Sequence, residues 1–382
     1  MGLSEMVYTM IPRLVGDYAA MMVVFSSTCK QAFMKAWTTA CIFSTGWPTI
    51  LIPSGKTFQL SPLTFEGPCL YASVHVRVEG NIVAPDKLWT SQNTTSWITF
   101  RDVTAFTVDG NGEIDGRGSV WWDCKTKNKC DSVPSAFGIL RCVDLTIAGI
   151  KLLNSPGKHL TVDSSKWVHL KGLSFASPAD SPDTDGIYIV ESHYVEVKDA
   201  AIGAGGDCIA IGTGSSGVNI TGIACGLGRG ISIGSSAGNG SSVIVEDVHV
   251  SNGSFYQSDG GLRVQTLQGG SGHAKGILFE HINFTSVGSP IVIDQFYCPG
   301  AHCKNSTSTV EVSDVRFVDV HGTSTTDMAI KFACNEKVPC TGIILDNVGI
   351  TSVARQNQAT SYCLNAKGKK LHEVIPDIAC LA

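Results

Sequence analysis

Hydrophobic and polar residues alternate in short segments from about residue 70 to about residue 350, and turns rich in Gly, Asn, Asp and Ser separate these segments. Alternation with a period of two is typical of β-strands, not of helices. The segments recur every ~23–27 residues in the first half of the chain and every ~30–35 later. The clearest ones are residues 145–152, 168–175, 195–202, 218–225, 277–284 and 312–319.

A period of this length indicates a solenoid, in which each unit buries its apolar face only by stacking on the next unit. Leucine-rich repeats have a similar period, but the Leu-x-x-Leu-x-Leu frame is absent. The pattern therefore predicts an all-β fold, a parallel β-helix. No Pro/Ser-rich linker divides the chain, and we expect a single domain over residues 28–382, with its coils at about 70–350.

Both ends of the solenoid have features of caps. Between Gln31 and Cys41, the residues Phe33, Met34, Trp37 and Cys41 follow helical spacing, so we predict a short N-terminal cap helix at about 28–42. Such a helix would cover the exposed strand edge of the first coil. Residues 334–382 carry four cysteines and few periodic segments, and we predict a disulfide-rich C-terminal cap there. Residues 1–27 form a divergent segment without the features of a signal peptide.

Composition excludes several classes of protein. Hydrophobic residues make up 43% of the 382 residues and charged residues 16%, which excludes a disordered polar chain. The net charge of −5 and the absence of a basic block argue against nucleic acid as a partner. The longest apolar run near the start, residues 18–25, is too short to span a membrane.

The fourteen cysteines favour disulfides over a metal site, because no cluster has two Cys-x-x-Cys halves. Candidate pairs of near neighbours are Cys208/Cys225, Cys298/Cys303, Cys334/Cys340 and Cys363/Cys380. Six Asn-x-Ser/Thr sequons fit a secreted glycoprotein: Asn93, Asn219, Asn239, Asn252, Asn283 and Asn305. We therefore expect an oxidising, extracellular environment.

The residues that could carry chemistry follow the repeat. Asp185, Asp207 and Arg229 are 22 residues apart, so coils of that length would place them side by side on consecutive coils. Arg263 follows in a longer coil and could join the same row. Glycine directly flanks Asp185, Asp207 and Arg229 and lies two residues before Arg263, which lets a large ligand approach the backbone. We predict one exposed column of acids and guanidinium groups.

The run from Ser181 to Cys298 resembles plant polygalacturonases, which are family 28 glycoside hydrolases. Residues 112–118, 153–156 and 293–298 extend the resemblance, which covers about 31–381. It implies a right-handed parallel β-helix with an open cleft. It also implies inverting hydrolysis of the α-1,4-galacturonosidic bonds of homogalacturonan (pectin), without a metal or other cofactor. The partner would be this cell-wall polysaccharide, and we expect a monomer.

Only some of the family's catalytic residues have a counterpart in this chain. Asp185 stands at the aspartate of the family's Asn-Thr-Asp motif, and Asp207 at the second aspartate of Gly-Asp-Asp-Cys. The first aspartate of that motif, the general acid, is replaced by Gly206, and the family's His by Arg229.

Substrate-binding positions are also altered. Asp183 replaces the Asn of the first motif, and the Arg-x-Lys pair becomes Arg263 and Gln265. Tyr297 matches a tyrosine that contacts substrate. If its strand were regular, Asp183 would share a face with Asp185; beside Pro182, it is also a natural turn former.

Loss of a positioned general acid lowers rates by about 10²–10⁴. We therefore expect a polygalacturonase-type hydrolase of weak or lost activity. The alternatives are a pectin-binding pseudoenzyme and a pectate-lyase-like enzyme with calcium and an arginine base. On the sequence alone, Gly206→Asp with Arg229→His should raise hydrolysis.

Overall fold

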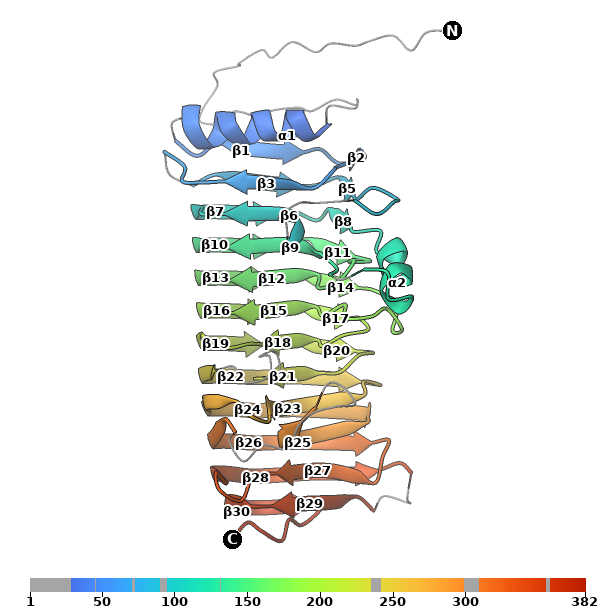
Figure 1. Cartoon of the computed structure of the whole chain (residues 1–382), viewed down its shortest axis with the longest axis vertical. Helices are drawn as coiled ribbons and strands as arrows, with labels where there is room; N and C mark the ends of the chain where they lie inside the picture. Colours follow the sequence, from blue (N-terminus) through green and yellow to red (C-terminus); the bar gives the residue numbers. More distant parts are fainter. Residues whose placement is uncertain are drawn as a thin grey trace.

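The computed structural model describes residues 29–44, 46–70, 73–89, 95–130, 132–234, 242–298, 309–354 and 358–382. Over these residues the chain winds into a parallel β-helix, whose coils stack along one axis from α1 to β30 (Figure 1). The predicted parallel β-helix is confirmed. The divergent segment 1–27 lies outside the described residues.

One wall of the solenoid is an 11-stranded parallel sheet that carries the candidate site. Its strands are β3 (Leu63–Glu66), β6 (Ser96–Arg101), β9 (Ser135–Leu140), β12 (Leu160–Asp163), β15 (Ile187–Val190), β18 (Ile209–Ile211), β21 (Ile231–Ile233), β23 (Gly260–Leu267), β25 (Ser289–Tyr297), β27 (Met328–Ala333) and β29 (Thr360–Leu364).

The remaining strands form a 19-stranded sheet that bends around the rest of each coil. They are β1 (Thr49–Ile52), β2 (Thr57–Gln59), β4 (His75–Val78), β5 (Asn81–Val83), β7 (Thr104–Asp109), β8 (Glu113–Asp115), β10 (Val143–Ala148), β11 (Lys151–Leu153), β13 (Lys166–Lys171), β14 (Ser174–Ala176), β16 (His193–Lys198), β17 (Ala201–Gly203), β19 (Ser215–Thr221), β20 (Ala224–Gly226), β22 (Ser242–Tyr256), β24 (Ser271–Val287), β26 (Glu311–Ser324), β28 (Cys340–Ser352) and β30 (Ala366–Ile375).

Aliphatic side chains stack in columns inside the solenoid and fix the register of the coils. In the 11-stranded sheet, Ile187 pairs with Ile209, Ile209 with Ile231, and Ile231 with Leu262. All four side chains are fully buried, and burial of each stabilises the fold by about 1.5–3 kcal/mol. Because side chains alternate along a strand, this buried column also fixes which residues point to solvent.

The predicted N-terminal cap helix is confirmed as α1 (Cys29–Thr38), which continues as a π-helical turn, η1 (Thr39–Phe43). Its apolar face packs on the first coils. The Trp37 ring lies 5.0 Å from the ring of Phe65 and 5.5 Å from that of Phe100, between ring centroids. The helix thus covers the end of the hydrophobic core, as Figure 1 shows. A second helix, α2 (Ser119–Thr126), lies on the outside of the solenoid (Figure 1).

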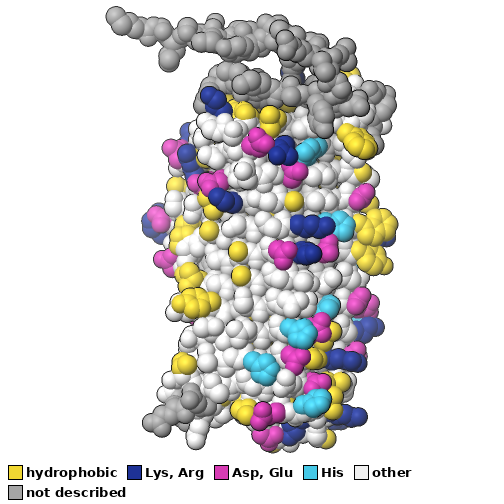
Figure 2. Space-filling view, turned by 180° about the vertical axis from the view of Figure 1, so that it is seen from behind, with side chains coloured by type: hydrophobic (Ala, Val, Ile, Leu, Met, Phe, Trp, Pro, Cys, Tyr) yellow, Lys and Arg dark blue, Asp and Glu magenta, His cyan; other side chains and the backbone are white. Residues whose placement is uncertain are grey.

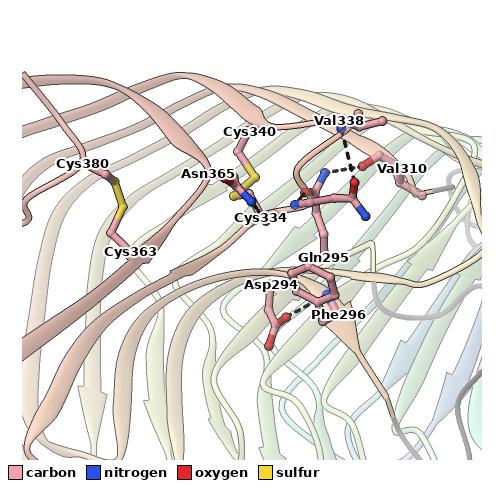
Figure 3. The surroundings of a disulfide bond; sticks show 11 residues. Asp294, Gln295, Phe296, Val310, Cys334, Val338, Cys340, Cys363, Asn365 and Cys380 are labelled. Carbon is pink, nitrogen blue, oxygen red and sulfur yellow. Dashed lines mark hydrogen bonds between the residues drawn. A yellow bond between two sulfur atoms is a disulfide. The ribbon is translucent and has the colours of Figure 1, made fainter. Parts of the chain in front are cut away.

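Each disulfide with both partners described joins two cysteines that have no other cysteine between them in the sequence. The predicted pairs Cys208–Cys225, Cys334–Cys340 and Cys363–Cys380 are confirmed, and Figure 3 shows the last two in the C-terminal coils. Cys298 is also disulfide-bonded, whereas Cys303 lies outside the described residues. Two further pairs were not predicted, Cys41–Cys69 and Cys124–Cys130. The second has the same spacing as Cys334–Cys340, so the sequence held a signal for it.

Among the described residues, no helix has the length and apolar composition needed to cross a membrane. In the same part of the chain, no three His, Cys, Asp or Glu side chains are grouped as a metal site.

Candidate active site

Asp185, Asp207 and Arg229 lie at equivalent positions of three consecutive coils. Each lies two residues before one of the isoleucines of the buried column Ile187–Ile209–Ile231, and these isoleucines pair in continuous register. The backbone NH of Asp207 donates a hydrogen bond to Oδ1 of Asp185 (2.7 Å), which ties one coil to the next. The predicted spacing therefore brings these three residues together.

Arg263 joins the group from a different position of its coil. It lies in β23 in register with Ser232, so it is not a fourth member of the column. Its long side chain nevertheless reaches back, and its Nη2 lies 2.5 Å from Oδ1 of Asp207. Ser232 donates its hydroxyl hydrogen to the other oxygen of the same carboxylate. Both carboxylate oxygens of Asp207 thus accept hydrogen bonds from neighbouring side chains.

Gln265 has a supporting role that the sequence did not reveal. Its Oε1 accepts a hydrogen bond from Nη1 of Arg263 (2.9 Å), and its side chain is buried. Gln265 therefore orients the guanidinium group of Arg263 toward Asp207.

Arg229 bridges the two carboxylates at the surface. Its Nη2 lies 3.6 Å from Oδ1 of Asp185, and its Nε lies 3.3 Å from Oδ1 of Asp207. The Arg229 side chain is 42% exposed, whereas each carboxylate is 10% exposed. The prediction of an exposed column is therefore wrong for the two acids, because Arg229 and the neighbouring coils shield them from solvent. A permanently charged guanidinium thus lies where the resemblance places a histidine, and it cannot exchange a proton with substrate.

The pKa of Asp185 is raised above its usual value. Burial of the carboxyl is the main cause, and the negative charge of Asp207 adds to it. The positive charges of Lys158 and Arg229 act in the opposite direction. Asp185 therefore takes up a proton more readily than a free aspartate does.

Gly206 lies directly against Asp185. A Cβ atom added at Gly206 would lie 2.3 Å from Oδ1 of Asp185 and 2.6 Å from its backbone nitrogen. The carbonyl oxygen of Gly206 accepts a hydrogen bond from the backbone NH of Arg229 (2.9 Å). Gly206 thus offers no carboxyl group where the resemblance places the general acid, and its neighbours occupy the space that a side chain would need.

Asp183 lies outside this group. It precedes β15 in a turn with φ of 53°, its side chain is exposed, and it forms an ion pair with Lys125 of α2. The expectation that Asp183 shares a strand face with Asp185 is therefore wrong, because the backbone turns between them. The turn-forming role beside Pro182 fits the geometry.

Besides Lys125, two further cations near the site were missed by sequence reasoning. Lys331 of β27 donates a hydrogen bond to Asp294 of β25 (2.7 Å), and Asp294 is in register with Gln265. Lys158 lies over the ring of Tyr188, with Nζ 4.9 Å from the ring centroid. Only the strand register could have placed these lysines beside the site. The predicted Tyr297 ends β25 and is partly buried there.

A buried histidine supports the backbone beneath Asp185. Nδ1 of His159 lies 3.0 Å from the carbonyl oxygen of Asp185, so it donates the hydrogen bond, and Nε2 accepts one from the hydroxyl of Ser177 (2.9 Å). Burial lowers the pKa of His159 to about 4. His159 is therefore neutral wherever the site is intact at mildly acid or neutral pH.

We expect His159 to make the protein less stable in acid. In the unfolded chain His159 binds a proton below its ordinary pKa of 6.5, but in the folded chain only below about 4. The unfolded state therefore binds more protons between these values, and stability falls as the pH falls through that window. His159→Gln keeps a donor for Asp185 but cannot titrate, so it should reduce this loss.

Urea unfolding at pH 7 and pH 4.5 measures the difference. His169→Gln is the matched control, since His169 is partly exposed and paired with Glu196. Equal acid sensitivity in wild type and His159→Gln would contradict the prediction.

Residues 44–373 match the family described as "Glycosyl hydrolases family 28". A probable polygalacturonase from Arabidopsis thaliana is 40% identical over 358 residues, which cover 92% of this chain and 77% of that protein. A polygalacturonase from Persea americana is 37% identical over 342 residues, covering 88% of this chain and 73% of the relative.

Solved structures share the fold at low sequence identity. The endo-xylogalacturonan hydrolase from Aspergillus tubingensis superposes with a TM-score of 0.76 at 20% identity, covering 91% of this chain and 96% of that one. A polygalacturonase from Erwinia carotovora gives a TM-score of 0.73 at 22% identity, covering 93% and 96%. The predicted right-handed winding is confirmed by this likeness. Since the family match spans most of the chain and the plant relatives are more than one third identical over nearly all of it, the chain belongs to family 28 of the glycosyl hydrolases.

Proposed function

We propose that this protein binds homogalacturonan at the site around Asp185 and Asp207 and hydrolyses it weakly or not at all. The observation that carries the proposal is the geometry at Gly206. The general-acid position has no side chain, and Asp185 fills the space beside it. Reaction by the family's usual route would therefore lack a proton donor for the leaving sugar oxygen.

Inverting hydrolysis needs two carboxyl groups in different states on opposite sides of the bond, about 6.5–9.5 Å apart. In this chain Asp185 and Asp207 lie on adjacent coils, and both contact the guanidinium of Arg229. They are suited to hold an attacking water, but neither stands at the position of the acid. We expect hydrolysis about 10²–10⁴ slower than in a relative with all three aspartates.

The charge around the site favours binding of a polyanion. Arg229, Lys125 and Lys331 are all more than one third exposed, and Lys158 is partly exposed. Such cations attract the carboxylates of a galacturonate chain and speed its association. The relatives' names, polygalacturonase, support the same polymer as the ligand.

One observation favours retained activity as a second candidate. The raised pKa of Asp185 makes it a possible proton donor, with Asp207 left to activate water. Inverting hydrolysis would then run with a displaced acid. Asp185→Asn should abolish such residual activity and leave binding largely intact.

A single preparation tests these alternatives. The purified protein is incubated with polygalacturonate, and bound polymer, released reducing ends and ultraviolet absorbance are measured together. We expect binding with few or no reducing ends. Rapid release of reducing ends would refute the pseudoenzyme, absence of binding would refute the whole proposal, and a chelator-sensitive unsaturated product would identify the lyase alternative.

We also propose a secreted, glycosylated monomer of the cell wall. The disulfides support an oxidising compartment. Three of the six sequon asparagines, Asn219, Asn252 and Asn283, are described and exposed, as glycan attachment requires. Mobility before and after deglycosylation, together with sedimentation, checks both statements.

A further inference from the structure

Two large aromatic side chains lie exposed on neighbouring coils, away from the carboxylate site. Trp167 is 47% exposed and Tyr194 is 55% exposed. Their rings stack with centroids 6.3 Å apart and planes inclined by 18°. We call Trp167 and Tyr194 the aromatic pair.

The backbone at the aromatic pair adopts a conformation that bulky residues avoid. Trp167 has φ of 55° and Tyr194 has φ of 56°. The adjacent pairs Lys166–His193 and His193–Ser216 show that these residues and Gly217 hold equivalent positions of successive coils. Gly217 has the same left-handed conformation, φ of 64°, at no steric cost. The same conformation recurs at the equivalent residues Asp144 and Asp247, so the coil itself requires it. What distinguishes the pair is that two exposed aromatic side chains occupy a position that suits Gly or Asp better.

Polar and cationic groups surround the pair. Nζ of Lys166 lies 4.2 Å from the ring centroid of Trp167 and 5.5 Å from that of Tyr194. Beside Tyr194, the side chain of His193 bonds Ser216 (2.8 Å), and both line a surface hollow of about 210 Å³. Figure 2 shows a face of the solenoid on which lysine, histidine and acidic side chains lie close together and hydrophobic side chains form only small groups.

We propose that the aromatic pair, with Lys166 and the adjacent hollow, is a second binding site for pyranose rings of an acidic polysaccharide. Aromatic ring faces carry negative charge and pack against the C–H groups on one face of a sugar ring. Lys166 pairs with a uronate carboxylate. In the hollow, the hydroxyl of Ser216 and the neighbouring hydroxyl groups form hydrogen bonds with the hydroxyl groups of the sugar. This inference takes the polymer, homogalacturonan, from the proposed function.

The aromatic pair is separated from the carboxylate site along the coil. Asp185 precedes β15 by two residues, whereas Tyr194 lies beyond the end of β15, as the second residue of β16 in the next wall. The two sites therefore lie at opposite ends of β15, across the width of the 11-stranded wall. Two separate contacts on one long polymer raise its apparent affinity by avidity.

The test compares polygalacturonate binding by wild type, by Trp167→Gly/Tyr194→Gly and by Arg229→Ala, in native gels that contain the polymer. Glycine fits the left-handed backbone, so the double variant should keep its melting temperature. We expect its affinity for long polymer to fall on the order of tenfold. Trp47→Ala is the matched control, because Trp47 is 73% exposed and lies near the N-terminal end of the solenoid, several coils from the aromatic pair.

The variants separate the two proposals. If only Arg229→Ala weakens binding, the aromatic pair is not a site. If only the double variant weakens binding, the pair stands and the carboxylate site is not the binding site; a wild type that does not bind overturns both. Lys166→Gln should weaken binding of polygalacturonate but not of highly methyl-esterified homogalacturonan, and equal effects on both polymers would overturn the role of Lys166.

Discussion

Arg263→Ala should lower the free energy of unfolding by about 3 kcal/mol or more and weaken polygalacturonate binding. Removal of one partner from a buried ion pair leaves the other charge without compensation, which typically destabilises by about 3–5 kcal/mol. The side chains of Arg263 and Asp207 are 12% and 10% exposed, so the pair is largely shielded from water. Arg229 and Ser232 still contact Asp207 in the variant, so we expect a loss of stability near the lower end of this range.

The salt dependence of binding distinguishes the two effects of Arg263→Ala. Loss of this cation makes the whole site more negative, which should reduce affinity for the polyanion more at low salt than at high salt, because ions screen the long-range attraction through solvent. Arg316→Ala is the control, since Arg316 and its partner Asp314 are 53% and 57% exposed and should contribute less than about 1 kcal/mol. Unchanged polymer binding by a folded Arg263→Ala protein would remove Arg263 from the site.

Gly206→Asp should destabilise the protein and fail to restore hydrolysis on its own. The added Cβ would approach the backbone nitrogen of Asp185 to 2.6 Å and the carbonyl carbon of Thr184 to 2.8 Å. Backbone atoms in a stacked coil cannot rotate away as a side-chain tip can, so two coils must shift. Overpacking of this kind typically costs about 1–3 kcal/mol.

The structure thereby changes the expectation drawn from the sequence, in which Gly206→Asp with Arg229→His raises hydrolysis. The same substitution would also displace Oδ1 of Asp185, which accepts the hydrogen bond of Asp207. Gly203→Asp is the matched control, because a Cβ there meets its nearest atom at 3.7 Å. Thermal unfolding and release of reducing ends measure the outcome. A stable, active Gly206→Asp protein would mean that Asp185 moves aside readily.

The fold could be predicted from the sequence because a solenoid is built from local, repeated patterns. Period-two alternation identified the strands, and the repeat length identified the stacking of coils, since each unit contacts mainly its neighbours. The column of Asp185, Asp207 and Arg229 followed from the same arithmetic, because coils of 22 residues return to the same position. Helical spacing likewise placed α1 at the end of the solenoid.

What only the tertiary structure decided lies where coils differ in length or where the backbone turns. Arg263 comes from a longer coil, so its register with Ser232 and its reach to Asp207 could not be read from spacing. Asp183 and the aromatic pair depend on left-handed residues, which break the alternation that sequence reasoning assumes. The lack of room at Gly206 arises from contacts between two coils. The sequence shows that residue 206 is small, but only the structure shows which atoms fill the space beside it.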